Sequence, residues 1–178
     1  MADGTLKVGT ITNSAGSGNI TIGSGVTLQS NVPAFQAYLS SNQSGLTDSA
    51  TVLAQLNTTA LDTDNAFDTS TYTFTCPVAG KYFVYAKTSL VSSGTARETK
   101  TYVYKNDSTI LSNIMEFIGS PLVINDGATW SGAQTSGIVD LAVNDTLKLY
   151  GRMNTNSTTW SFVSGITETT LGAYRIGV

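Results

Sequence analysis

Histidine is absent from this 178-residue sequence, and cysteine occurs only once. Without histidine the chain lacks the commonest general base and the commonest metal ligand at neutral pH, so neither a Ser-His-Asp triad nor a Cys-His pair can form. A single cysteine, Cys76, allows no internal disulfide and no CxxC motif, and we expect it to be buried as a small hydrophobic side chain. Phosphate-binding loops and Gly-x-Ser-x-Gly elbows are missing as well. We therefore expect no catalytic residues and a protein that is not an enzyme.

Charge is also scarce, since charged residues make up 12% of the chain against roughly 25% in an average soluble protein. The net charge of −3 comes without any run of basic residues, so we expect no nucleic-acid partner. No apolar run approaches the roughly 20 residues that span a bilayer, and we expect no membrane insertion. The first residues lack the charged start and apolar core of a signal peptide. A protein of this kind would leave a cell by another route, such as release of virus particles by lysis.

Residues 1–30 are rich in Gly, Ser and Thr and contain only short apolar segments, such as Ile20-Thr21-Ile22 and Val26-Thr27-Leu28. Each short segment alternates with period two, which is typical of strands, but none can bury much surface alone. We interpret residues 1–30 as an arm that anchors the protein or forms a stalk. The alternative is a partly disordered leader.

From residue 31 onward the sequence alternates apolar and polar residues between Asn/Asp/Gly turns, with no sustained helical period. This pattern predicts an all-β sandwich or jelly roll of about ten antiparallel strands. The expected strands are Ala34–Leu39, Ala50–Leu56, Tyr72–Cys76, Lys81–Leu90, Arg97–Lys105, Thr109–Phe117, Trp130–Leu141, Asp145–Arg152, Thr158–Ser164 and Leu171–Ile176.

Five motifs occur in an order that is typical of one family. They are Pro33-Ala34-Phe35-Gln36-Ala37, Asn65-Ala66-Phe67-Asp68, Phe74-Thr75-Cys76-Pro77-Val78-Ala79-Gly80-Lys81-Tyr82-Phe83, Ser136-Gly137-Ile138-Val139-Asp140-Leu141 with Asn144-Asp145, and Leu171-Gly172-Ala173-Tyr174-Arg175-Ile176. Residues 31–178 thus resemble a C1q-like domain, the jelly roll shared with the tumour necrosis factor (TNF) superfamily. Two positions depart from the family pattern: Tyr72 and Asn144 stand where glycine is common. No collagen Gly-x-y stalk precedes the motifs.

The resemblance implies a homotrimer, because domains of this family cover their apolar sheet faces by trimerising about a threefold axis. Candidates for that interface are Tyr82, Val84, Tyr102, Tyr104 and Tyr174. The alternative for each of them is a place in the sandwich core.

Two further groups of residues are candidate ligand sites. Asp62, Asp64 and Asp68 place carboxylates close together in sequence, and some C1q-like trimers carry calcium, although the spacing does not match an EF-hand loop. The alternative is that these side chains cap turns. No other cofactor is expected. Trp130 and Trp160 are the only tryptophans, and an exposed indole could stack on a sugar ring, whereas a buried one would be a packing residue.

Residues 1–30 resemble the Gly/Ser/Thr-rich leaders of bacteriophage virion proteins. We therefore expect a non-enzymatic virion structural protein: a trimeric fibre, knob or capsid-surface appendage at the virion surface. Its arm would bind other virion proteins, and its outward C1q-like head could attach to a host surface glycan. One alternative is a secreted C1q-like recognition domain with no virus. A second is a polysaccharide-cleaving appendage with a carboxylate pair formed between subunits.

Overall fold

The computed structural model describes Ser24 and residues 32–115, 122–123 and 129–177. The chain divides into two units, residues 1–31 and 32–178. The second unit contains the strands of the described residues and is called the head below. Apart from Ser24, the predicted arm of residues 1–30 lies outside the described residues.

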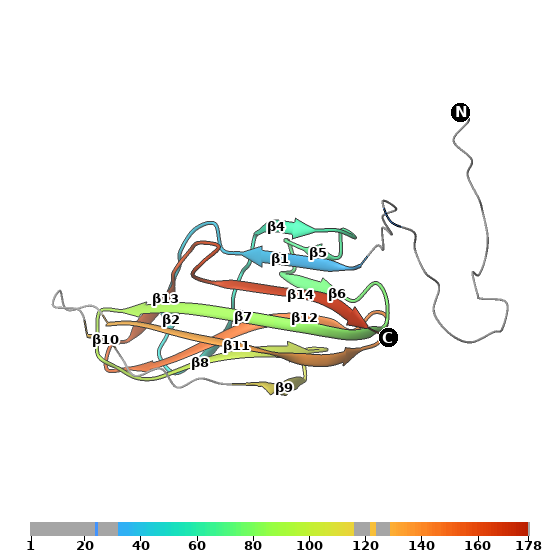
Figure 1. The fold of residues 1–178 in the computed structure, drawn as a ribbon. Coiled ribbons are helices and arrows are strands. Elements are labelled where there is room, and N and C mark those ends of the chain that lie inside the picture. The colour runs from blue at the N-terminus through green and yellow to red at the C-terminus, as the bar shows by residue number, and fades with distance from the viewer. Residues whose placement is uncertain (1–23, 25–31, 116–121, 124–128, 178) are drawn as a thin grey trace. The chain divides into compact units, whose positions relative to one another are not determined.

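The head is a sandwich of two antiparallel sheets, and the predicted all-β jelly-roll class is confirmed (Figure 1). Sheet A has the order β10-β11-β7-β14-β1-β4, with β13 paired to β7 and β2 paired to β13. Its strands are β1 (Ala34–Tyr38), β2 (Gln43–Thr47), β4 (Thr58–Asp62), β7 (Gly80–Ser92), β10 (Leu122–Val123), β11 (Thr129–Leu141), β13 (Thr159–Phe162) and β14 (Thr170–Gly177). Sheet B has the order β5-β6-β12-β8-β9, with β3 paired to β12. Its strands are β3 (Thr51–Leu53), β5 (Phe67–Asp68), β6 (Thr73–Thr75), β8 (Ala96–Lys105), β9 (Thr109–Met115) and β12 (Thr146–Thr155).

The core lies between the two sheets and contains the inward half of each alternating strand. On β7 the inward residues are Tyr82, Val84, Ala86 and Leu90, all buried. Aromatic rings fill the end of the core near β5 and β6, where the ring centroids of Phe35 lie 4.3 Å from Phe74 and 5.4 Å from Phe67, both stacked. This alternation fixes the pairing register of the long strands, because a shift of one residue would turn all of their apolar side chains from the core to the solvent.

Each of the ten predicted segments contains a strand, but the described residues hold fourteen. The four additional strands are β2, β4, β5 and β10. β2 (Gln-Ser-Gly-Leu-Thr) and β4 (Thr-Thr-Ala-Leu-Asp) each contain a single large apolar residue, and β5 and β10 have two residues each. Pairing with a neighbouring strand, rather than local residue preference, makes these segments extended.

The two positions that depart from the family's glycine pattern both adopt positive φ angles. Tyr72 has φ 58° and Asn144 has φ 71°, which is the left-handed region that glycine adopts without cost. Asparagine tolerates this region, whereas a bulky residue rarely does. The backbone at both turns therefore has the conformation that glycine favours, with other side chains in its place.

Candidate assembly surface on sheet A

The structure places the five residues predicted for a trimer interface in three different parts of the head: the core and the outer faces of the two sheets. Tyr82 and Val84 are fully buried in the core of one chain, so the prediction is wrong for these two residues. They are buried because odd and even residues of β7 face opposite sides of sheet A, and the even residues face sheet B. The Tyr82 hydroxyl donates to Val78 O at 2.6 Å, and burial raises the pKa of Tyr82 above its ordinary value.

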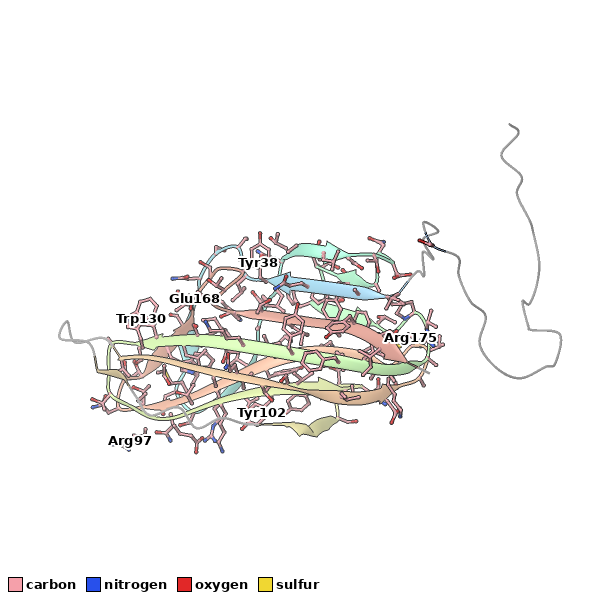
Figure 2. The ribbon with its side chains drawn as sticks, in the orientation of Figure 1. Tyr38, Arg97, Tyr102, Trp130, Glu168 and Arg175 are labelled. Carbon is pink, nitrogen blue, oxygen red and sulfur yellow. The ribbon has the colours of Figure 1, made fainter. Side chains whose placement is uncertain are left out.

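Tyr102 and Tyr104 lie half-buried on the outer face of sheet B, away from the core (Figure 2 labels Tyr102). Tyr102 is the direct cross-strand partner of Tyr150, and the Tyr104 and Tyr150 ring centroids are 4.5 Å apart. Burial raises the pKa of Tyr150, and the nearby Asp107 carboxylate adds to this effect. These tyrosines therefore form a cluster of their own on the opposite side of the sandwich from Tyr174.

Tyr174 belongs to an apolar patch on the outer face of sheet A. The strand register places Ile138 of β11 opposite Phe83 of β7, and Phe83 opposite Tyr174 of β14. The Phe83 ring centroid lies 5.5 Å from that of Tyr174 and 6.4 Å from that of Tyr85. Ile138 is 53% exposed and Tyr174 44% exposed. We call these four residues, Phe83, Tyr85, Ile138 and Tyr174, the Phe83 patch.

Gly172 makes room for one side of this patch. A Cβ atom at position 172 would overlap the Cζ and hydroxyl oxygen atoms of Tyr85, so the Tyr85 ring lies across the bare backbone of β14. Burial raises the pKa of Tyr85, and the neighbouring Tyr174 contributes to this shift. The absence of a side chain at 172 is therefore what lets the ring lie on the sheet.

The Phe83 patch is bordered by a hollow and by ion pairs. The hollow has a volume of about 560 Å³, and its lining includes Phe83, Tyr85, Gln134, Ser136 and Thr170. On one side of the patch Lys81 Nζ lies 2.7 Å from Asp140 Oδ1. On the other side Lys87 Nζ donates to Thr167 O and lies 3.8 Å from Glu168 Oε2. An apolar centre with a polar rim is the usual anatomy of a protein–protein interface.

Of the three calcium candidates, Asp62 and Asp68 accept hydrogen bonds from backbone N–H groups of the turns that follow them. The Asp62 oxygens accept from the backbone N–H groups of Ala66 and Phe67, both at 2.9 Å. Asp68 Oδ1 accepts from the Ser70 hydroxyl at 2.7 Å, and hydrogen bonds from Ser70 and Thr71 lower the pKa of Asp68 to about 2. Asp64 Oδ2 accepts from the Thr63 hydroxyl at 2.5 Å. Within the part of the chain that the structure describes, no group of three His, Cys, Asp or Glu residues could hold a metal ion.

The two tryptophans have opposite environments. Trp160 is 1% exposed, and its indole Nε1 donates to Thr47 O at 2.8 Å, so the stacking prediction is wrong for this residue because its ring faces the core. Trp130 is 41% exposed on the outer side of β11, where its partners across the strands are Val91 and Leu122. Trp130 and Arg175 lie near opposite ends of the head (Figure 2). Trp130 remains a candidate for ligand stacking.

Cys76 is buried, as predicted. Its thiol donates to Val78 O at 3.2 Å, the same carbonyl oxygen that accepts from Tyr82. The thiol is thus part of the core packing beneath the turn that leads into β7.

Phe83, Tyr85 and Ile138 are the patch residues that sequence reasoning missed. On β7, the alternation of Phe83 and Tyr85 with Tyr82 and Val84 shows that the two pairs face opposite sides. Both pairs are aromatic or aliphatic, however, so local sequence does not reveal which side is the core.

A helix long and apolar enough to cross a membrane does not occur among the described residues.

Comparison with known proteins finds similarity in structure but not in sequence. No protein-family model matches the chain, and no curated protein matches it. A crystal structure of murine APRIL at pH 5.0 is 10% identical, covers 82% of this chain and all of its own, and has a TM-score of 0.57. Eiger TNF from S. frugiperda is 12% identical over 82% of this chain and 93% of its own, with a TM-score of 0.57. The globular domain of zebrafish complement 1qA is 14% identical over 82% and 98%, with a TM-score of 0.47.

The first two matches, together with the two-sheet topology, show that the head has a jelly-roll fold like those of APRIL and Eiger TNF.

Proposed function

We propose that the protein is a non-enzymatic, homotrimeric module whose subunits meet through the Phe83 patch. The observation that carries this proposal is the patch itself, in which large apolar side chains from three adjacent strands lie together at the surface of one chain. Contiguous exposed apolar patches with polar rims mark interaction sites in soluble proteins. Burying the patch against another copy of the chain would remove its apolar area from water.

The similarity in fold supports a trimer as the assembly. TNF-type and C1q-type jelly rolls assemble as homotrimers. A threefold ring uses a heterologous interface, in which the patch of each subunit meets a different surface of the next. The hollow beside Phe83 offers the concave part of such a contact, with Gln134 and Ser136 as hydrogen-bonding groups.

A pair of matched double variants tests which face is the interface. Phe83→Ser with Tyr174→Ser should convert the trimer to a folded monomer, as measured by light scattering and circular dichroism. Tyr104→Ser with Tyr150→Ser removes two aromatic rings from the outer face of sheet B and should leave the trimer intact. If only the sheet B variant dissociated, the Phe83 patch would not be the interface.

We further propose that the trimer is an appendage on the surface of a virus particle, anchored through residues 1–30 to other virion proteins. Support comes from the Gly/Ser/Thr-rich composition of these residues and from the jelly roll that follows them. The head would then face outward, outside the host after release, where it could attach to a host surface glycan. Trp130, the exposed indole, is the residue that we propose would stack on a sugar ring.

Removal of residues 2–30 tests the anchoring role. The truncated head should still fold and trimerise but should be missing from purified particles, as measured by quantitative immunoblotting. Normal incorporation of the truncated protein would contradict anchoring by the arm. If the full-length protein purified free of virion proteins, the favoured function would be a secreted C1q-like recognition domain instead.

A further inference from the structure

Two buried hydroxyl groups in the core have no hydrogen-bond partner among the described residues. They are Thr99 Oγ1 on β8 and Ser131 Oγ on β11. Thr99 is fully buried and Ser131 is 7% exposed. A buried hydroxyl without a partner is costly, and native proteins normally supply one in the protein or in ordered water. Valine has nearly the same shape as threonine without the polar group, so a hydroxyl at this core position calls for an explanation.

The strand arrangement brings the two hydroxyls to the same level of the sandwich. β7 pairs antiparallel with β11, and β7 turns directly into β8, so β8 and β11 run in the same direction in the two sheets (Figure 1). Thr101 of β8 donates to Ala133 O of β11 at 3.3 Å, which fixes the relative level of the two strands. Thr99 and Ser131 each lie two residues earlier on these strands. They therefore occupy the next level on the inward faces, yet they do not hydrogen-bond one another.

The levels on either side are also polar. On one side the hydroxyls of Thr88 and Thr101 are 2.6 Å apart. On the other side the hydroxyls of Ser92 and Thr155 are 3.2 Å apart, and Ser92 also donates to Thr159 O at 3.0 Å. Buried hydroxyls thus occur at three successive levels of the core, and among the described residues it is the middle two that lack direct partners.

We propose that Thr99 and Ser131 bind an internal water molecule that bridges their hydroxyl groups. An internal water typically makes two to four hydrogen bonds to polar groups that would otherwise be unsatisfied. The two hydroxyls provide two of these. Thr101 Oγ1, which gives its proton to Ala133 O, keeps a lone pair for a third even when it accepts from Thr88. The ligand of this site is water, because Thr99 and Ser131 offer it two neutral hydroxyl groups that can both donate and accept.

A crystal structure of the full chain at a resolution near 1.5 Å tests the site directly. The proposal expects a water peak about 2.8 Å from both Thr99 Oγ1 and Ser131 Oγ. Density showing the two hydroxyls bonded directly to each other, or an empty gap between them, would overturn it.

Thermal unfolding of three variants gives an independent test in solution. With a bridging water, Thr99→Val and Ser131→Ala should each lower Tm by about 2–4 °C, because each leaves the water or the remaining hydroxyl poorly bonded. The double variant should lose less than the sum, since the water and its ligands are then removed together. If the hydroxyls were simply without partners, each single variant would raise Tm and the effects would add.

Thr169→Val is the matched control. Thr169 is equally buried, but its hydroxyl donates directly to Val163 O at 2.7 Å. Its loss should lower Tm while leaving the water peak between Thr99 and Ser131 in place. Disappearance of the peak in this control, where both proposed ligands are still present, would mean that Thr99 and Ser131 do not by themselves hold the water, and would overturn the assignment.

Discussion

At the scale of single residues, Tyr72 has a backbone conformation that glycine adopts more readily. Its φ of 58° places the backbone in the left-handed region, where the Cβ atom of an L-residue is crowded at a cost of roughly 1–2 kcal/mol. Glycine removes this cost, but it also makes the unfolded chain more flexible, which lowers the free energy of unfolding by about 0.4–1 kcal/mol. We therefore expect Tyr72→Gly to raise the free energy of unfolding by about 0.5–1 kcal/mol, measured by denaturant titration.

Asn144→Gly is the control for this prediction. Asn144 has a similar φ of 71°, but asparagine tolerates the left-handed region, so the change should be only a few tenths of a kcal/mol. A clear loss of stability in Tyr72→Gly would show that contacts of the tyrosine ring outweigh the backbone strain.

Asp68 makes part of the head's stability depend on pH. Hydrogen bonds from Ser70 and Thr71 hold its pKa at about 2, below the ordinary 3.8. Since the folded-state pKa is lowered, the stabilisation is present above pH 3.8 and is lost as the pH falls toward 2. The Tm difference between wild type and Asp68→Asn should therefore shrink between about pH 5 and pH 2. A difference that stayed constant over this range would show that these hydrogen bonds do not favour the charged carboxylate.

The two tryptophans should differ in fluorescence. Trp130→Phe leaves only the buried Trp160, whose emission should be shifted to the blue and resist quenching by acrylamide. Trp160→Phe leaves Trp130, which should be readily quenched. The same variant leaves Thr47 O without its indole donor and should destabilise the head by about 1–3 kcal/mol. Equal quenching of both tryptophans would contradict their assigned environments.

At the scale of strands, Gly172 of β14 controls the position of the Tyr85 ring. Alanine at 172 would place a Cβ atom inside the space of the Tyr85 ring, so the ring must leave the sheet surface and the Phe83 patch must change shape. We expect Gly172→Ala to raise the dissociation constant of the trimer about tenfold, which is about 1.4 kcal/mol, while the head stays folded. Sedimentation equilibrium over a dilution series measures this.

Gly132→Ala serves as its control on β11. The nearest atom to a Cβ there would be Thr88 O at 3.6 Å, an ordinary contact, so trimerisation should not change. An unchanged dissociation constant in Gly172→Ala would mean that Tyr85 takes no part in the interface.

The strand scale also shows how far the sequence can predict this fold. Period-two alternation located the long strands, because β7, β11 and β12 each bury one side against the opposite sheet. It did not locate the edge strand β4, whose central residues are exposed and carry no alternating signal. Nor did it show which side of β7 was the core, since Tyr82 and Phe83 have equally apolar rings. That choice depends on where sheet B packs, which is a property of the tertiary structure.

At the scale of the whole molecule, a trimer accounts for the exposed apolar residues on sheet A. Ile138 and Tyr174 are about half exposed in the single chain, and the ion pairs Lys81–Asp140 and Lys87–Glu168 lie at the rim rather than inside the patch. Exposed ion pairs contribute little stability, so the apolar centre would supply most of the association energy. Since these ion pairs contribute little, self-association should depend only weakly on salt concentration.

The molar mass of the unmodified protein in solution tests the central claim most directly. Size-exclusion chromatography with multi-angle light scattering at micromolar concentration should give close to three times the 18.7 kDa chain mass. A single species at 18.7 kDa under the same conditions would contradict the trimer.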